Sequence, residues 1–177
     1  MSHPFSARHA LVLGALLLGT AASAQNNNST SDWAGWTFGL SPYTLHYSDA
    51  KKENEWEPDD EKHSYVWLVQ AEKRLDARHI AGLALFSNSF GQFTQYAYYG
   101  WQFQPLDSLP GLYAKVTAGV IHGYKEPYHK KIPFNHKSGW GLTAIPAIGY
   151  QITPHWSAQL NILGNAGLMA QINYTLR

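Results

Sequence analysis

Apolar and polar residues alternate along several stretches of this chain, as they do in β-strands. In residues 112–121, and again in residues 168–176, an apolar side chain recurs at every second position. Successive side chains of a strand point to opposite faces, so this two-residue period predicts strands with one apolar face. Eight such segments are expected: residues 36–48, 64–72, 80–86, 96–103, 112–123, 140–150, 156–163 and 167–176. Strands that cross a membrane need about 9–11 residues, so we expect the short third and seventh segments to extend into their loops.

The connections between the expected strands differ in length and charge. Residues 49–63 are numerous and mostly charged, residues 87–95 are polar and residues 124–139 carry lysines, whereas residues 73–79 and 151–155 form short links. Bacterial barrels combine long outer loops with short periplasmic turns. The pattern therefore predicts an all-β fold, an eight-stranded antiparallel transmembrane β-barrel of the outer membrane. Strand count places the end of the first strand and the loop after the third on the same outer rim.

The N-terminus has the order of features found in a secretory signal peptide. Arg8 precedes an apolar run at residues 10–18, and an Ala-Ser-Ala sequence ends at Ala24. We interpret residues 1–24 as a signal peptide, residues 25–35 as a short polar leader and residues 36–177 as the barrel. The apolar run is too short to cross a bilayer as a helix.

Composition narrows the class of protein further. The chain has no cysteine, seven Trp and eleven Tyr, and its 13 Lys and Arg nearly balance 12 Asp and Glu. A balanced charge gives no bulk attraction to nucleic acid, so no nucleic-acid partner is expected. Trp and Tyr favour membrane–water interfaces, and without cysteine there is no thiol nucleophile or thiolate-bound metal. The composition leaves two classes, a soluble secreted β-domain or a transmembrane barrel.

Residues of the expected outer rim have side chains suited to acyl chemistry. His46 ends the first expected strand, and an imidazole can act as a general base near neutral pH. Ser89 lies in the loop after the third strand, and its hydroxyl becomes a nucleophile only when a base takes its proton. Beside it, Asn88 can hydrogen-bond an oxyanion or orient a neighbouring group. The plainer interpretation is a histidine that anchors the rim at the headgroups and a serine and asparagine in an ordinary turn.

Lysines and prolines suggest contact with lipid. Lys125, Lys130 and Lys131 lie in the loop after the fifth strand, where they either bind the phosphates of lipid headgroups or are simply solvated. Pro146 lies inside the sixth expected strand, and proline cannot donate to a strand ladder. It predicts either a tolerated bulge or, together with Pro42 in the first strand, a lateral gate through which a lipid reaches the lumen.

Several segments, in order, resemble the lipid A palmitoyltransferase family (PagP), and in particular its divergent branch. Residues 42–46, Pro-Tyr-Thr-Leu-His before a charged loop, are similar to the segment with the family's essential histidine. Residues 84–90, Ala-Leu-Phe-Ser-Asn-Ser-Phe, resemble its Ala-Phe-Lys-Asp-Ser-Trp, and residues 97–101, Ala-Tyr-Tyr-Gly-Trp, resemble its Ala-Gly-Tyr-Gly-Trp. Residues 132–134 and 144–150 resemble its later Ile-Pro-Leu and Leu-Pro-Leu-Ala-Ser-Val-Gly-Tyr segments.

The resemblance implies an outer-membrane acyltransferase that moves a palmitoyl chain from the sn-1 position of a phospholipid donor to lipid A. His46 and Ser89 would be catalytic, and the acyl chain would lie in an apolar lumen. The family's aspartate is matched by Asn88, which is no base but can still orient His46, and Asp49 is a second carboxylate near the rim. Tyr98 stands where the family has a glycine at the floor of the acyl pocket, so its ring would shorten that pocket.

No cofactor is expected, because exchange of an acyl chain between lipids is nearly thermoneutral. No metal is expected either, since His129 and His136 lie seven residues apart in a loop. The protein is expected to be a monomer. Two other functions stay open: a lipid A deacylase, although residues 156–176 lack a Ser–His cluster on a late strand, and a structural or adhesion barrel with a polar, filled interior. An aqueous transporter is disfavoured, because eight strands enclose no water-filled channel.

Overall fold

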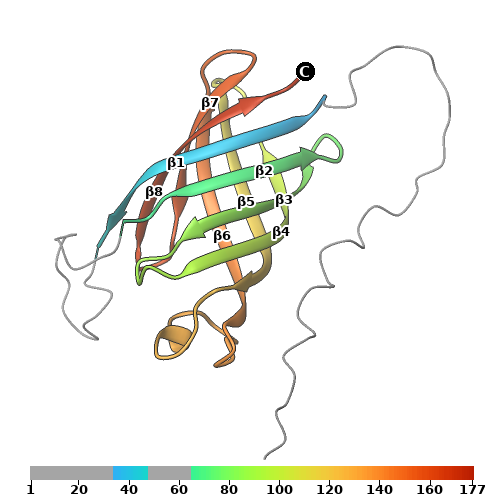
Figure 1. Cartoon of the computed structure of the whole chain (residues 1–177). Coiled ribbons are helices and arrows are strands. Elements are labelled where there is room, and N and C mark those ends of the chain that lie inside the picture. The colour runs from blue at the N-terminus through green and yellow to red at the C-terminus, as the bar shows by residue number, and fades with distance from the viewer. Residues whose placement is uncertain (1–33, 48–64) are drawn as a thin grey trace, which may run out of the picture. The chain divides into compact units, whose positions relative to one another are not determined.

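The computed structural model describes residues 34–47 and 65–177, which form one closed antiparallel barrel (Figure 1). Each strand pairs with its neighbours in sequence, and the last strand pairs with the first. The strands are β1 (Trp36–His46), β2 (Leu68–Arg74), β3 (His79–Ser87), β4 (Phe93–Phe103), β5 (Leu112–His122), β6 (Trp140–Gln151), β7 (Trp156–Ile162) and β8 (Gly167–Thr175). The predicted eight-stranded barrel is confirmed, whereas the signal peptide, nearly all of the leader and Asp49 lie outside the described residues.

Several strand boundaries differ from the prediction. β2 begins at Leu68 rather than at residue 64, and β4 begins at Phe93 rather than at residue 96. Two further differences have plain physical reasons. β2 continues to Arg74 because Lys73 and Arg74, which resemble loop residues, still join the wall: the Arg74 N–H donates to the Gly35 carbonyl at 2.9 Å. β7 does not extend into its loop, because the Leu163 N–H donates to the Gly167 carbonyl at 2.9 Å and closes a tight turn. β3, by contrast, does extend to Ser87 as expected.

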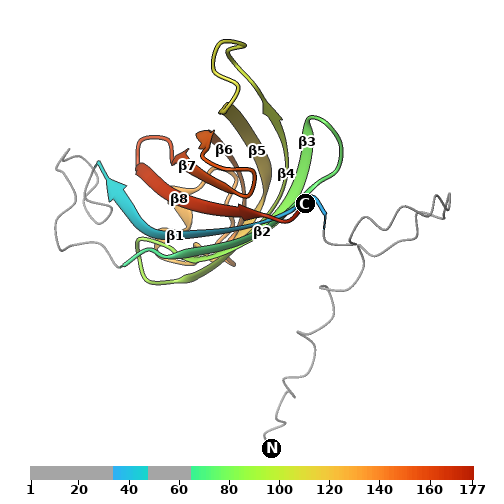
Figure 2. The same cartoon turned by 90° about the horizontal axis from the view of Figure 1, so that it is seen from above.

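The connections divide between the two ends of the barrel (Figures 1 and 2). We call one end the loop rim: it carries His46, residues 88–92, residues 123–139 with a short 3-10 helix η1 (Tyr128–Lys131), and residues 163–166. The other end, the turn rim, carries residues 75–78, 104–111 and 152–155. Strand count predicted this division, and it brings His46 and Ser89 to one rim.

The outer wall of the barrel is apolar. On β4 the residues that face outward are exposed and those that face inward are buried, in strict alternation from Phe93 to Trp101. Exposed aromatic side chains gather at both rims: Tyr43, Tyr65, Trp67, Phe93 and Trp140 toward the loop rim, and Tyr99, Trp101, Phe103, Tyr150 and Trp156 toward the turn rim. An apolar wall between two aromatic girdles is typical of barrels that lie in lipid. Within the described residues, no helix has the length and hydropathy to span a bilayer.

The inner wall changes character along the barrel axis. Toward the loop rim the inward side chains are mostly apolar and form one cluster: Val66, Leu68, Ala84, Phe86, Tyr96, Tyr98, Ile121 and Met169. Toward the turn rim the same strands turn polar side chains inward: Glu72, Tyr113, Lys115, Ser157, Gln159, Gln171 and Asn173. Asn161, which pairs with Met169, is a buried polar residue nearer the loop rim. We call these regions the loop-rim half and the turn-rim half of the lumen.

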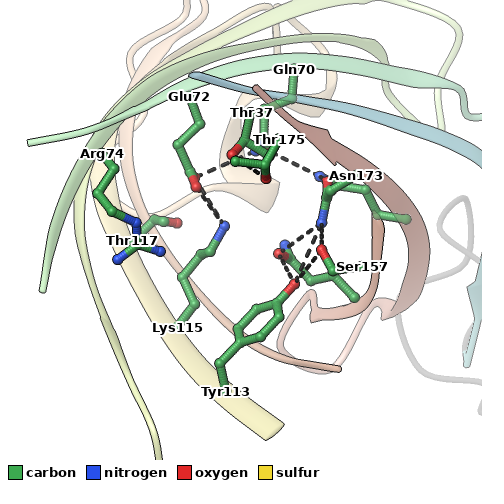
Figure 3. Close-up of polar contacts among 12 residues, drawn as sticks. Thr37, Gln70, Glu72, Arg74, Tyr113, Lys115, Thr117, Ser157, Asn173 and Thr175 are labelled. Carbon is green, nitrogen blue, oxygen red and sulfur yellow. Dashed lines mark hydrogen bonds and ion pairs between the residues drawn. The ribbon is translucent and has the colours of Figure 1, made fainter. Parts of the chain in front are cut away.

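Hydrogen bonds cross the turn-rim half (Figure 3). The Lys115 ammonium lies 2.9 and 3.0 Å from the two carboxylate oxygens of Glu72, and both side chains are buried. Asn173 donates toward the Tyr113, Ser157 and Gln159 oxygens, which joins β5, β7 and β8 across the barrel. The network does not fill this half of the lumen, because a cavity of about 260 Å³ at the turn rim is bordered by Tyr113, Lys115 and Asn173.

Candidate active site at the loop rim

The structure brings the two residues that sequence reasoning singled out into direct contact. His46 Nε2 lies 2.6 Å from Ser89 Oγ, a short hydrogen bond between the end of β1 and the loop that follows β3. His46 is only 3% exposed, so the imidazole faces the lumen rather than the headgroup region. A hydroxyl in hydrogen-bond contact with an imidazole is the arrangement from which the base can take the hydroxyl proton.

A break in the β1 ladder is what turns His46 inward. The register between β1 and β8 shifts between Leu40 and Tyr43, and two successive residues, Pro42 and Tyr43, are both exposed. Without this shift the strict alternation would continue from Ser41, and His46 would face the lipid. A one-residue slip moves every later side chain of a strand to the opposite face, so this bulge places Thr44 and His46 in the lumen.

Asn88 builds the loop that presents Ser89. Its side-chain oxygen accepts from the Phe90 and Gln92 N–H groups, both at 3.0 Å, and its amide nitrogen donates to Thr94 Oγ1 at 3.2 Å and Gln92 Oε1 at 3.4 Å. Two donors and two acceptor positions exhaust what an amide can offer. The expectation that Asn88 orients His46 is therefore wrong, because its bonds hold residues 88–92 in their turn. Gly91 completes that turn with a φ of 76°.

The long loop of residues 123–139 packs on the short one. The Phe90 ring stacks on the Tyr128 ring with centroids 3.9 Å apart, and the Lys125 N–H donates to Gln92 Oε1 at 3.1 Å. Tyr124 lies beneath this contact, where burial raises the pKa of its phenol to about 12. These contacts fix the backbone on both sides of Ser89 and make the two loops one unit.

Below the pair lies a cavity of about 440 Å³. It extends from His46 and Ser89 through the apolar cluster of the loop-rim half to Glu72 and Lys115. Its volume falls in the range of about 300–1,000 Å³ that small-molecule sites occupy. Tyr98 lines it as expected, and its ring lies across Gly82, its partner on β3, where a Cβ would collide with the phenol.

The floor of the cavity is a buried ion pair that the sequence reasoning missed. The Tyr98 hydroxyl donates to Glu72 Oε2 at 2.9 Å, and Lys115 binds the same carboxylate. The one available signal was that Glu72 and Lys115 both occupy inward positions of alternating strands, where a charge requires a partner. Register across β2, β4 and β5 was needed to show that they meet.

Each of the two predicted gate prolines lies at the end of a strand ladder. The described pairing of β1 with β2 ends at Ser41, next to Pro42, and the pairing of β6 with β7 begins at Ala147, next to Pro146. Within the described strands, residues 140–146 of β6 therefore pair with β5 alone, and residues 43–46 of β1 pair with β8 alone. Because proline has no N–H to donate, each marks the point where the wall loses its second ladder. Both stretches, each paired on one side only, border the cavity.

The predicted headgroup lysines do not act as one cluster. All three lysines are exposed, and Lys131 also lines the cavity, whereas Lys125 and Lys130 do not. Lys137 pairs with Glu126 at 3.4 Å on the solvent side. No three metal-ligating side chains gather anywhere in the described part of the chain. Of the three predicted headgroup lysines, one therefore borders the cavity and two are exposed away from its lining.

The arrangement offers a hydroxyl and a base at the mouth of an apolar cavity, which suits chemistry on an ester at the head of an acyl chain. Comparisons with known proteins give information on the fold only. No known protein family matches the chain, and no curated protein sequence matches it. Among solved structures, a barrel from the de novo design of transmembrane β-barrels is similar, with a TM-score of 0.52 and 14% identity over 81% of this chain and 97% of the designed one. The fold is thus that of a transmembrane β-barrel.

Proposed function

We propose that this barrel is an outer-membrane acyltransferase that moves a fatty acyl chain, such as palmitoyl, from a phospholipid to lipid A. The observation that carries the proposal is the 2.6 Å contact between His46 Nε2 and Ser89 Oγ at the mouth of the apolar cavity. The pair supplies a base and a hydroxyl, and the cavity supplies room for the chain. The resemblance of residues 42–46 and 84–90 to the lipid A palmitoyltransferase family supports the same reaction.

The two stretches of wall that are paired on one side only would let the acyl chain enter the cavity from the lipid without passing through water. Exposing a chain of about sixteen carbons to water would cost on the order of 10 kcal/mol, at about 0.8 kcal/mol for each methylene. A chain that passes between β6 and β7 above Pro146, or between β1 and β2 above Pro42, moves from lipid to cavity without that cost. The lateral gate is thus an energetic requirement of the proposed reaction.

The reaction needs one proton acceptor. The attacking hydroxyl gives its proton to His46, its oxygen bonds to the ester carbonyl carbon, and the leaving lysophospholipid oxygen takes the proton back. Two attacking hydroxyls are chemically open: that of Ser89, which gives an acyl-enzyme, or that of lipid A directly, with Ser89 holding His46. Intact-protein mass after incubation with donor alone separates them, because only the first route adds an acyl mass to the protein.

The lysines and the floor complete the proposed roles. Lys131 at the mouth would bind a headgroup phosphate, with Lys125 and Lys130 above it contacting the phosphates of neighbouring lipids. Tyr98, Glu72 and Lys115 would end the space for the chain. A structural barrel with a polar, filled interior accounts for the polar network of the turn-rim half but not for the cavity of about 440 Å³ in the loop-rim half.

Mass spectrometry of lipid A from cells that express the protein tests the proposal. The wild type should add one acyl mass, whereas His46→Ala and Ser89→Ala should not. Ser87→Ala is the matched control, since Ser87 lies two residues away and its hydroxyl donates only to the loop, to the Asn88 carbonyl at 3.4 Å. A loss of acyl mass would instead indicate a hydrolase that uses the same pair, and an unchanged lipid A with a folded wild-type barrel would reject the acyltransferase.

A further inference from the structure

One polar group in the cavity has no partner. Thr44 lines the cavity and is 5% exposed, and within the described structure its Oγ1 makes no hydrogen bond. A buried hydroxyl without a partner is costly, and native proteins rarely keep one without a reason. The neighbouring hydroxyls of the same strand and loop, by contrast, are bonded: Ser41 to the Tyr43 carbonyl and Ser89 to His46.

The position of Thr44 relates it to the catalytic pair. It lies two residues before His46 on β1, and the bulge at Pro42 and Tyr43 turns both side chains into the lumen. Strand rise separates the two residues by roughly 7 Å, with Thr44 on the deeper side. Its β8 partner across the ladder is Met169, a buried apolar residue. The hydroxyl thus stands in an apolar wall, one step below His46.

We infer that Thr44 is a further catalytic residue, which donates a hydrogen bond to the carbonyl oxygen of the donor ester. The inference rests on the proposed function, because it adds a residue to the same reaction. An acyl chain that lies in the cavity with its ester at the His46–Ser89 pair carries its carbonyl oxygen past this hydroxyl. No other substrate atom along the alkyl chain can accept a hydrogen bond.

The role follows the charge that develops in the reaction. When the attacking hydroxyl oxygen bonds to the carbonyl carbon and its proton passes to His46, the carbonyl π electrons move to its oxygen, which becomes an oxyanion. The Thr44 O–H then donates to that oxyanion. When the tetrahedral centre collapses, the carbonyl reforms, the bond to the glycerol oxygen breaks, and that oxygen takes the proton from His46. A donor held in a dry site stabilises this charge more strongly than it does the ground-state carbonyl.

Two substitutions separate this role from a structural one. Thr44→Val keeps the shape and removes the hydroxyl, whereas Thr44→Ser keeps the hydroxyl and removes a methyl group. With purified full-length protein, synthetic phospholipid donor and lipid A, Thr44→Val should lower kcat about 10²–10³-fold with little change in KM. Thr44→Ser should stay within several-fold of the wild type. In urea, Thr44→Val should unfold at the same or a higher midpoint, because it removes an unpartnered buried hydroxyl.

Binding of two analogues gives a readout that packing does not affect. A phosphonate analogue, whose tetrahedral centre carries a charged oxygen, should bind Thr44→Val more weakly by a factor similar to the loss in kcat. A donor with an sn-1 alkyl ether has no carbonyl oxygen and should bind the wild type and both variants equally. Wild-type kcat in Thr44→Val, an equal loss in Thr44→Ser, or a lowered unfolding midpoint in Thr44→Val would each overturn the inference. A wild type that transfers no chain would instead reject the acyltransferase itself.

Discussion

The two halves of the lumen are built on the same eight strands, yet the loop-rim half holds a cavity of about 440 Å³ beside an apolar cluster, whereas the turn-rim half combines a polar network with a smaller cavity of about 260 Å³. β5 illustrates the change: its inward residues run from Ile121 near the loop rim through Thr117 to Lys115 and Tyr113. Period-two alternation makes the wall in both halves. The identity of the inward residues decides whether that stretch of the barrel is lined by an apolar cluster or by a polar network.

The physical reason lies in what a void costs. An empty space beside apolar side chains leaves no hydrogen bond unmade, and apolar cavities can stay dry. Glu72, Lys115 and Asn173 border open space, but their charged and amide groups are bonded within the polar network, so none of them is left unpaired. The network is therefore a floor beneath the cavity of the loop-rim half.

The largest effect is expected from a substitution in the floor of the cavity, the buried ion pair of Glu72 and Lys115. Lys115→Met leaves the Glu72 carboxylate buried without its cation, which should cost about 3–5 kcal/mol of unfolding free energy. The double variant Glu72→Gln with Lys115→Met should recover most of that loss, because no charge stays buried. Urea unfolding followed by tryptophan fluorescence measures both. Lys130→Met on the exposed loop is the control and should change stability by less than about 0.5 kcal/mol.

The same variant tests the division of labour. At urea concentrations where the Lys115→Met barrel is still folded, acyl transfer from a short-chain donor should persist, since the floor touches no reacting atom. Loss of transfer in the folded variant would show that the turn-rim half takes part in the chemistry.

A second test fills the cavity of the loop-rim half. Ala84 is buried and lines the middle of the cavity, so Ala84→Phe should block the space below it. Transfer from a sixteen-carbon donor should fall at least about tenfold, while a donor short enough to end above residue 84 keeps its rate; the added ring should cost about 1–3 kcal/mol of stability. Ala97→Phe, on the outward face of β4, is the matched control. Equal loss for all donors would place the acyl chain elsewhere.

The barrel itself was predictable from sequence, because alternation in β5 and β8 is a local property of the chain. The inward orientation of His46 was not, since it depends on the register shift at Pro42 and Tyr43, which reverses the parity of the strand. The ion pair of Glu72 and Lys115 depends on register between strands that are not neighbours in the barrel. Long-range register is set by the closed sheet as a whole, so no single segment contains it.

Asn88 shows the opposite kind of error. The sequence marked it as a candidate beside Ser89, and it does lie there, but its four side-chain bonds serve the turn. Asparagine is a frequent turn residue because its amide bonds to nearby backbone groups. Proximity in sequence therefore placed Asn88 beside Ser89, but its side-chain bonds hold the turn and do not reach His46.

The lysines of the loop rim give a smaller effect. Changing Lys125, Lys130 and Lys131 together to glutamine should slow transfer from anionic phospholipid vesicles, by about fivefold for each contact that is made, since each is worth about 1 kcal/mol at an anionic surface. The loss should shrink at high salt and on zwitterionic vesicles. Lys137→Gln is the control, because Lys137 already pairs with Glu126. A salt-independent loss would mean that the lysines stabilise the loop rather than bind headgroups.

The smallest effect is expected farthest from the site, at the turn of residues 75–78. The N–H groups of Arg78 and His79, and then the His79 imidazole, hold the pKa of Asp76 at about 2, below its usual value of 3.8. Folding thus favours the carboxylate, so the contribution is complete above about pH 4 and is lost as the pH falls through about 2. Asp76→Asn should therefore flatten the acid decline of the urea midpoint between about pH 4 and pH 2, and leave acyl transfer at neutral pH unchanged. A parallel acid decline in the wild type and the variant would show that the turn gains no stability from the charge, and a change in transfer would link the turn rim to the proposed site across the polar network.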